Sequence, residues 1–480
     1  MSIDFLAILP EILILVVGLL VLVLDPFWRD ENRRTNLGWL VAGGLTATLV
    51  ACLLFDRPSQ NVLAFGGMVR YDWLAFVFKM LFIFGATITS LFMMDVDKVG
   101  KRAEAYLLLL AATIGMNLMA ASSDLVMLYL AIETTSIPMY VLAGFLLDDK
   151  KSTEAGFKYL LFGAMTSAIF LYGLSLVYGF SGSTHFEGMR SYFTTFNPVS
   201  LGVMCLVVVG LGFKVSLVPF HFWAPDTYEG APTPISGFLS TASKAAGFAV
   251  LIRLFITVFP QIAFDWQMLL AILAVLTMTF GNLVALAQTN IKRLLAYSSI
   301  AHAGYALIGL VANNQLGVTG VIYYLLAYIL TNLAAFGIIM AFGRVTGSDE
   351  IRSYDGMSRR SPYLGLAMLV AFLSLAGMPP FGGFMGKVLV FAGAVQAGWY
   401  LLVFIGVLNS IIGLYYYLTV LKYVYLYRME GETEEAHPIQ LSRPFVVGIV
   451  VLTIGIVLVG SIFAPWFGFS TDAAKSLFLF

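Results

Sequence analysis

Charged residues are scarce in this sequence. Only 11% of its 480 residues are Asp, Glu, Lys or Arg, against about 25% in an average soluble protein, whereas 60% are hydrophobic. The 27 basic residues balance the 27 acidic ones, and no concentrated basic stretch of the kind that binds nucleic acid is present. The composition therefore excludes a soluble domain and a nucleic-acid partner, and it indicates an all-α polytopic membrane protein.

Cysteine is nearly absent, and so are the usual cofactor motifs. Cys52 and Cys205 both lie in apolar runs, with no CxxC or Cys/His spacing around them. This excludes a disulfide framework and a metal cluster. The sequence also lacks GxGxxG, Walker A, CxxCH and HExxH patterns, so we expect no nucleotide, haem, iron–sulfur or zinc site on this chain.

Long hydrophobic runs are what the sequence has in abundance. Residues 1–24 carry Asp4 and Glu11 where a secretory signal would be positive, so we expect a retained first span. With about 20 residues per crossing, about fourteen spans are predicted, an even number that places both termini on one side. They lie near 6–25, 37–55, 71–94, 103–121, 124–147, 153–180, 199–222, 233–258, 267–287, 293–312, 317–344, 362–396, 398–427 and 444–466.

Basic residues are distributed unequally between the two sets of loops. By the positive-inside rule, the set with 17 of them is assigned to the cytoplasm, and the set with five, which includes the tail, to the outside. Both termini are therefore predicted outside. The larger set comprises Arg29, Arg33, Arg34, Lys98, Lys101, Arg102, Lys150, Lys151, Lys292, Arg293, Arg344, Arg352, Arg359, Arg360, Lys422, Arg428 and Arg443, and the smaller set comprises Arg57, Arg70, Arg190, Arg253 and Lys475.

Two of the predicted spans contain a proline break next to a lysine. The seventh reads SLVPFH with Lys214 before the break, and the twelfth reads SLAGMPPF with Lys387 after it. A proline inside a helix frees backbone groups that lipid cannot satisfy, so both helices are predicted to be discontinuous. Related broken helices in the two halves of a membrane protein are a feature of inverted repeats and point to the transport site.

The similarity between the two proline-break segments suggests how the predicted single membrane domain, 1–480, is divided. By the loop assignment the seventh span enters from outside and the twelfth from inside, as an inverted repeat requires. We place two five-helix units at 103–258 and 267–427. Three N-terminal spans, within 1–102, and a last span at 444–466 flank them.

A series of ionisable residues lies inside the predicted spans. Glu133 and Lys244 are about nine and eleven residues into theirs, which is roughly 13 and 16 Å deep at 1.5 Å per residue. Lys158 is only about five residues in, where a lysine can extend its amine back to the surface. Lys79 stands alone in the third span, outside both predicted units, and we expect it to contact a peripheral partner or another subunit.

Buried carboxylates and amines permit proton transfer. Burial disfavours the charged form of each group and an opposite charge favours it, so a conformational change can switch where a proton resides. His302 is placed to relay between Lys244 and Lys387 through water. The alternative for these groups is a static ion pair, and for His221 it is capping of freed backbone groups. Most aromatic residues are expected in packing and interface belts.

Five motifs in this order resemble a known family. They are IETTSIPMY around Glu133, FKVSLVPFHFWAPDTYEGAPTP around Lys214, STASK ending at Lys244, IKRLLAYSSIAHAGY around His302 and GMPPFGGFMGK ending at Lys387. Together they resemble the antiporter-like membrane subunits of respiratory complex I, over nearly the whole chain. The length and Lys387 favour the branch without a C-terminal lateral helix and without a glutamate at that position.

The resemblance implies roles for individual residues. Glu133 and Lys214 would form the coupling pair of a first half-channel and Lys244 the central carrier. His302 and Lys387 would lead to a second half-channel, and Lys158 matches a sixth-span lysine of the favoured branch.

The resemblance also implies a setting. NADH, FMN, iron–sulfur clusters and quinone would belong to other subunits of a proton-translocating NADH:quinone oxidoreductase in the bacterial inner membrane. The partners would be membrane-arm subunits of the M, L, K, J, A and H types, the peripheral arm indirectly, and lipid. The alternatives are an Mrp-type sodium/proton antiporter subunit, a membrane subunit of a related hydrogenase, and a static scaffold.

Overall fold

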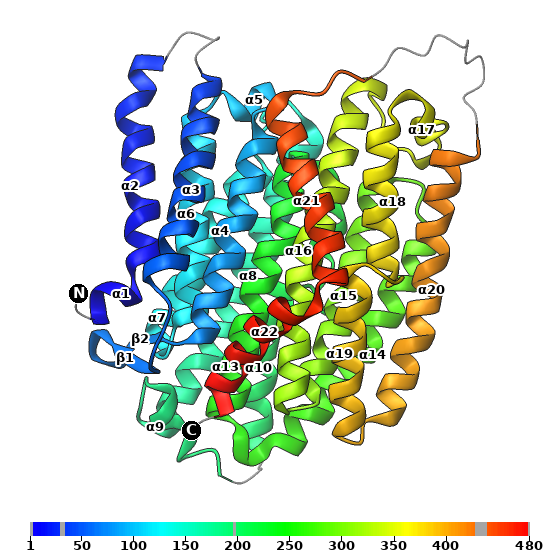
Figure 1. Cartoon of the computed structure of the whole chain (residues 1–480). Helices are drawn as coiled ribbons and strands as arrows, with labels where there is room; N and C mark the ends of the chain where they lie inside the picture. Colours follow the sequence, from blue (N-terminus) through cyan, green and yellow to red (C-terminus); the bar gives the residue numbers. More distant parts are fainter. Residues whose placement is uncertain (1–2, 29–33, 195–197, 428–438, 479–480) are drawn as a thin grey trace.

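The chain folds as a bundle of helices that run roughly parallel to one another (Figure 1). The computed structural model describes residues 3–28, 34–194, 198–427 and 439–478. Within these ranges thirteen helices are long and apolar enough to cross a membrane, and two shorter apolar helices, α18 (Pro362–Ala376) and α19 (Gly382–Gln396), follow each other. Counted as one interrupted crossing, this pair completes the fourteen expected, and the predicted fold class is confirmed.

The crossing helices satisfy their backbone groups internally except at the two breaks, as lipid requires. In chain order they are α2 (Leu9–Leu24), α3 (Thr35–Phe55), α4 (Trp73–Met93), α6 (Ala103–Ala121), α7 (Leu125–Ala143), α8 (Lys150–Ser181), α10 (Pro198–Val215), α12 (Thr233–Phe238) continued by a π-helical turn (Leu239–Ser243) into α13 (Lys244–Val258), α14 (Ala263–Leu286), α15 (Ile291–Val311), α16 (Gln315–Thr346), α18 with α19, α20 (Tyr400–Tyr425) and α21 (Arg443–Ser461).

Shorter elements connect these helices. They are α1 (Ile3–Ala7), α5 (Asp97–Gly100), α9 (Phe186–Arg190), α11 (Trp223–Gly230), α17 (Met357–Arg360), α22 (Phe463–Phe478), the antiparallel strands β1 (Val62–Ala64) and β2 (Val69–Tyr71), and single 3-10 turns at Asp25–Trp28, Phe65–Gly67, Pro260–Ile262 and Ile351–Tyr354.

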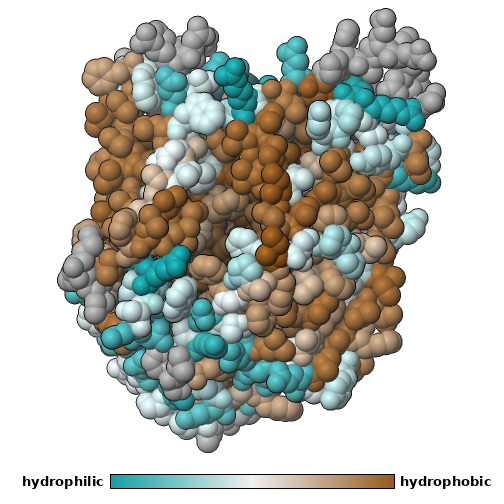
Figure 2. All heavy atoms as spheres, in the orientation of Figure 1, coloured by the Kyte–Doolittle hydropathy of each residue, from teal (hydrophilic) through white to brown (hydrophobic). Residues whose placement is uncertain are grey.

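The outer surface matches a lipid environment. Figure 2 shows apolar side chains over the sides of the bundle and hydrophilic ones at the top and the lower left. The helix α17, which carries Arg359 and Arg360, lies at the top of Figure 1 together with α5, and both termini lie away from that end. Arg29, Arg33 and Arg428, which contribute to the predicted orientation, lie outside the described residues. Arg253, assigned above to an outer loop, is instead buried inside α13, so that assignment is wrong.

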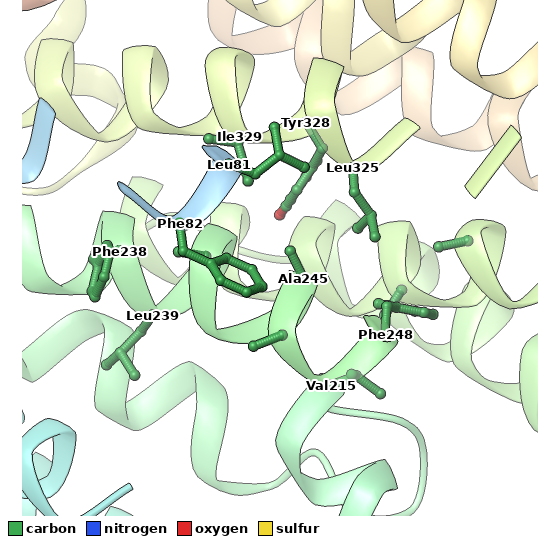
Figure 3. Packing of buried hydrophobic residues seen from close by; sticks show 14 of the residues in the cluster. Leu81, Phe82, Val215, Phe238, Leu239, Ala245, Phe248, Leu325, Tyr328 and Ile329 are labelled. Atoms are coloured by element: carbon green, nitrogen blue, oxygen red, sulfur yellow. The ribbon is translucent and has the colours of Figure 1, made fainter. Parts of the chain in front are cut away.

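The centre of the bundle is formed by α12–α13, α15 and α16, which are almost entirely enclosed by other helices. Figure 3 shows Leu81 of α4 beside Ile329 of α16, and Phe82 of α4 facing Ala245 of α13. Because these helices are surrounded on all sides, their side chains are shielded from both lipid and water. Any ionisable residue on them is therefore held in an apolar interior.

The C-terminal end holds one helix that the sequence patterns do not predict. The expected last span, 444–466, ends in the structure at Ser461, and α22 follows after a bend. α22 packs against α16 and α4, with the Phe469 and Trp73 rings 6.1 Å apart. The sequence did not predict α22 because its mixture of apolar and polar residues makes it less hydrophobic than a membrane span.

Candidate functional site

The first predicted break lies directly after α10. Pro219 has no backbone N–H and cannot continue the helix, and Ser216 adopts a φ of 60°. Neighbouring groups satisfy the backbone here: the Val218 N–H donates to the Thr277 hydroxyl at 3.1 Å, and the Trp223 indole donates to the Phe213 carbonyl at 3.0 Å. The predicted discontinuity of the seventh span is therefore confirmed.

Lys214, in the last turn of α10, faces the helix that carries Glu133. Its Nζ donates to the Ser136 hydroxyl of α7 at 2.9 Å, and Glu133 accepts a hydrogen bond from Ser167 of α8. Glu133 and Lys214 both line a cavity of about 20 Å³, which is room for about one water molecule. The structure thus brings the predicted pair to one cavity, although among the described residues Lys214 makes no ion pair within 4.0 Å.

Lys244 lies at the centre of the bundle, directly after the π-helical turn. Its Nζ donates to the Ser299 hydroxyl of α15 at 2.6 Å and lies 5.8 Å from the centre of the Tyr228 ring. Only 2% of the residue is exposed, and no acidic partner lies within 4.0 Å in the described part of the chain. Single π-helical turns inside helices occur frequently at functional sites. Lys244 is thus a buried amine with a hydroxyl partner.

The second predicted break separates α18 from α19. α18 ends at Gly377, whose φ of 84° suits glycine. Lys387 of α19 reaches back across the break, where its Nζ donates to the Ala376 carbonyl at 3.0 Å and to the Ser410 hydroxyl at 2.8 Å. A positive charge at a helix C-terminus is favourable because the last carbonyls carry partial negative charge. The broken twelfth span is confirmed, and Lys387 satisfies part of its freed backbone.

Replacing Gly383 with alanine should test how tightly this break is packed. A Cβ atom there would lie 1.9 Å from the Ser374 carbonyl oxygen, and a backbone atom cannot move away cheaply. We expect the folded state to lose about 2–3 kcal/mol, measured as a lower midpoint of thermal unfolding of the purified chain. Gly179→Ala on α8, where the new Cβ meets nothing within 4 Å, should be neutral or slightly stabilising. Equal midpoints for the two variants would contradict the packing.

His302 of α15 lies near enough to Lys244 and Lys387 for both charges to act on it, and tyrosine hydroxyls bind both of its ring nitrogens. Its Nδ1 is 2.5 Å from the Tyr324 hydroxyl and its Nε2 is 3.0 Å from the Tyr417 hydroxyl. Tyr417 also hydrogen-bonds Ser298, the neighbour of the residue that binds Lys244. The structure therefore connects His302 to its surroundings through hydroxyls of the protein itself.

On the other side, the Lys387 amine lies 4.9 Å from the Tyr305 ring centre. Tyr305 is one turn from His302 on α15, and its hydroxyl accepts a hydrogen bond from Asn282 at 2.9 Å. The sequence reasoning assigned most tyrosines to packing, so it missed Tyr324 and Tyr417. One signal was present: a tyrosine in the middle of a span lies too deep for an interface belt.

Lys158 lies apart from the row of buried groups formed by Lys214, Lys244, His302 and Lys387. Its amine lies 2.6 Å from both Glu154 and Asp226, and about a third of its side chain is exposed. Arg293 bridges Asp226 and Glu229. Burial would raise the pKa of Asp226, but hydrogen bonds from Lys158 and Arg293 lower it below its ordinary value.

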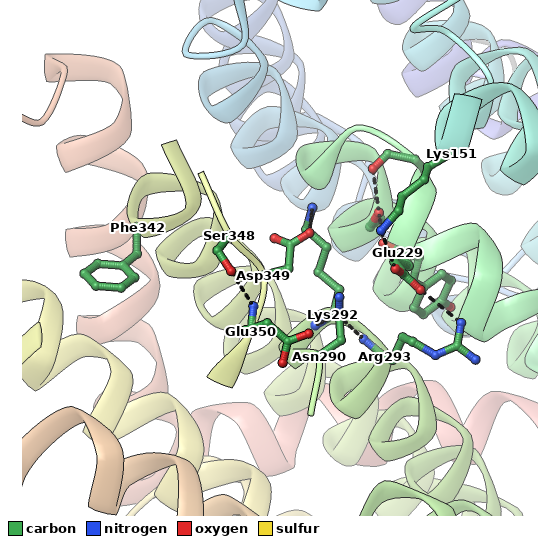
Figure 4. Close-up of polar contacts among 12 residues, drawn as sticks. Lys151, Glu229, Asn290, Lys292, Arg293, Phe342, Ser348, Asp349 and Glu350 are labelled. Carbon is green, nitrogen blue, oxygen red and sulfur yellow. Dashed lines mark hydrogen bonds and ion pairs between the residues drawn. The ribbon is translucent and has the colours of Figure 1, made fainter. Parts of the chain in front are cut away.

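The ion pairs around Lys158 continue into a wider surface network. Figure 4 shows Lys151 and Arg293 converging on Glu229, with Lys292 and Asp349 beside them. Lys158 therefore belongs to a partly exposed cluster of opposite charges at the basic end of the molecule.

The structure also shows the contacts of Lys79 and His221, two buried residues outside this cluster. Lys79 was expected to contact a peripheral partner or another subunit, and within this chain its amine lies 2.8 Å from Glu11 of α2. His221, at the first break, is buried between the Phe222 and Phe280 rings. Its Nδ1 has no hydrogen-bond partner among the described residues.

Fourteen crossings, two interrupted helices and a buried row of amines define a polytopic helical membrane protein of the transporter class. Comparison with known proteins identifies the family. Residues 122–413 match the family described as NADH:quinone oxidoreductase/Mrp antiporter, TM. A Moorella thermoacetica protein named NADH-quinone oxidoreductase subunit N is 43% identical over 98% of this chain and 98% of its own. This chain therefore belongs to the NADH:quinone oxidoreductase/Mrp antiporter family of transmembrane proteins.

Solved structures agree with this assignment. A chain of respiratory complex I from Thermus thermophilus, solved with bound aureothin, is similar with a TM-score of 0.81 and 34% identity, covering 96% of this chain and 98% of that chain. A chain of the Mrp complex from Dietzia sp. DQ12-45-1b has a TM-score of 0.87 at 19% identity, covering 100% and 98%. The second similarity is one of fold alone.

Proposed function

We propose that this chain is the N-type membrane subunit of a proton-translocating NADH-quinone oxidoreductase. The observation that carries the proposal is the row of buried groups, Lys214, Lys244, His302 and Lys387, each hydrogen-bonded to a hydroxyl from another helix. A buried amine makes a protein less stable than an apolar side chain of similar volume would. Four buried titratable groups in one bundle therefore indicate a functional role rather than a structural one. The relatives named subunit N match this chain over nearly its full length.

Each member of the row receives a role in this proposal. Glu133 and Lys214 act as the coupling pair, because they share a cavity with room for about one water. Lys244 is the central carrier, and His302 and Lys387 pass protons toward the second half-channel. Their serine and tyrosine partners can both donate and accept hydrogen bonds, as a proton path requires. Lys158 acts at the charged surface that leads to the row.

The remaining assignments follow from the same proposal. The inverted units span 103–258 and 267–427, and the chain lies in a bacterial inner membrane with both termini outside. NADH, FMN, iron–sulfur clusters and quinone bind to other subunits. The neighbours are the membrane-arm subunits, through which the peripheral arm acts indirectly.

Co-purification with activity tests the proposal. A tag on this chain should recover a complex that reduces quinone with NADH and acidifies the lumen of sealed inside-out vesicles. An Mrp-type antiporter is the second candidate, favoured by the shared fold, and it would instead exchange sodium for protons without NADH. Recovery of cation antiport without NADH-linked quinone reduction would overturn the first assignment.

Glu133→Gln tests the coupling pair, because glutamine keeps the size of the side chain and removes its charge. We expect about tenfold slower NADH-driven pumping, which corresponds to the loss of a charge interaction of about 1.4 kcal/mol in the rate-limiting step. The measurement is the initial rate of proton uptake per complex in vesicles. Glu104→Gln, at an exposed acid of α6, is the matched control and should remain close to wild type. Unchanged pumping in Glu133→Gln would argue against an electrostatic trigger.

A further inference from the structure

A second group of buried charges lies in the three N-terminal spans, outside the row described above. It consists of Glu11 in the first turn of α2, Asp56 directly after the end of α3, and Lys79 in the second turn of α4. These residues are 7%, 2% and 4% exposed. All three elements meet at the end of the bundle that carries the N-terminus (Figure 1). No role in the proposed proton row requires them.

The contacts within the group leave two carboxylate oxygens without a hydrogen-bond or ion-pair partner among the described residues. The Lys79 amine lies 2.8 Å from Glu11 and donates to the Ala7 carbonyl, also at 2.8 Å. Asp56 accepts a hydrogen bond from the Tyr71 hydroxyl through its backbone carbonyl, at 3.1 Å. The side-chain Oδ1 of Asp56 and the Oε2 of Glu11 are both buried and have no hydrogen-bond partner among the described residues.

The charges of the group do not balance. Two carboxylates face one ammonium, so the fully ionised group carries a net negative charge inside the protein. An unpaired buried charge is strongly unfavourable unless it is neutralised.

No nearby group of the described chain supplies the missing positive charge. The guanidinium of Arg57 is exposed and donates to the Leu53 carbonyl. Asp4 is itself an acid, and it accepts a hydrogen bond from the Phe65 N–H between β1 and β2. The other titratable groups that face Asp56 are Cys52 of α3 and Tyr71 of β2, and both are neutral or negative.

We propose that Glu11, Asp56 and Lys79 form a proton-binding site, separate from the central row, in which Asp56 holds one proton taken from the water at this end of the bundle. The site couples the packing of the three N-terminal spans to the pH on that side. It does not depend on the function proposed above, because none of its residues belongs to the row.

The titration of Asp56 supports the geometry. Burial raises its pKa to about 7, although the charge of Lys79 acts in the opposite direction. In the unfolded chain an aspartate titrates near 3.9. Between these values the folded protein binds the proton and the unfolded chain does not, so stability falls as the pH rises toward 7 and is then constant.

Infrared difference spectroscopy of the full-length chain in lipid nanodiscs tests the site directly. Spectra taken about one pH unit below and above pH 7 should contain the band of a protonated carboxyl that is lost on the alkaline side. Asp56→Asn should remove this band, and its midpoint of thermal unfolding should fall less than that of wild type as the pH rises through 7. Asp472→Asn, at an exposed acid of α22, is the control and should keep the wild-type spectrum.

Two more variants complete the test. Lys79→Met removes the charge that opposes protonation, so the carboxyl band should persist to higher pH. This variant still tests the site if Asp56→Asn fails to fold. A band that disappears in Glu11→Gln but survives in Asp56→Asn would show that Asp56 is not the acceptor. A wild-type chain without a carboxyl that titrates near pH 7, or a band unchanged by all three variants, would overturn the proposal.

Discussion

Replacement of Lys244 with alanine is expected to leave an assembled complex that has lost most of its NADH-driven proton pumping. Lys244 follows a π-helical turn at the centre of the bundle, and its amine is held by the Ser299 hydroxyl at 2.6 Å. No other ionisable side chain of α12 or α13 occupies this central position, since Arg253 lies further along α13 and is bound to Asp72. Removal of the amine therefore interrupts the proposed path where no neighbour replaces it, and we expect a loss of more than about tenfold.

The measurement must separate pumping from folding. Alanine leaves a cavity that costs stability, so Lys244→Met, which nearly preserves the volume, should be compared with it. Both variants should lose proton uptake in vesicles while the amount of assembled complex is quantified in parallel. Lys475→Ala, at an exposed lysine of α22, is the matched control. An assembled Lys244→Met complex that pumps at the wild-type rate would show that Lys244 is not the central carrier.

Replacement of Arg253 with methionine is expected to prevent stable folding of the chain. The Arg253 guanidinium binds both oxygens of Asp72, at 2.8 and 2.9 Å, and also donates to the Ala120 carbonyl at 3.0 Å. The two side chains are 1% and 0% exposed. Removal of one partner from a buried pair leaves an uncompensated charge, which typically costs about 3–5 kcal/mol. This loss is comparable to a large part of the stability of a typical protein.

A second substitution should restore part of that loss. Asp72 also accepts a hydrogen bond from the Ala75 N–H as the N-cap of α4, at 2.8 Å, and asparagine can retain this cap. Asp72→Asn together with Arg253→Met should therefore be more stable than Arg253→Met alone. The measurements are the amount of chain in the membrane and the midpoint of thermal unfolding, with the exposed Arg190→Met as control. Normal accumulation of Arg253→Met would mean that the pair contributes little.

Patterns of neighbouring residues were sufficient for the crossings and for both breaks. A hydrophobic run of about 20 residues must form a helix in lipid, because no other local structure satisfies its backbone there. Pro219 and the Pro379–Pro380 pair lack the backbone N–H that would continue a helix, whereas Pro138 lies inside α7 without ending it. α22 escaped the same reasoning, because its polar and charged residues make it less hydrophobic than a membrane span.

Partners distant in the chain could not be predicted in this way. Lys79 was expected to contact a peripheral partner or another subunit, but the sequence did not identify Glu11, 68 residues earlier, as the residue that its amine binds. Arg253 was placed in an outer loop on its charge alone, but Asp72 allows it to lie inside. Lys158 joined a surface network with Asp226, since α11 folds back beside α8 after the first break.

The sequence alone determined the membrane class, the number of crossings, the interrupted helices and the identity of the buried amines, because each depends on the hydropathy and backbone chemistry of a single segment. Only the tertiary structure decided which hydroxyls receive Lys214, Lys244 and Lys387, which tyrosines flank His302 and which carboxylate neutralises Arg253. Those pairings join helices that are far apart in the chain, and they are selected by how the whole bundle packs.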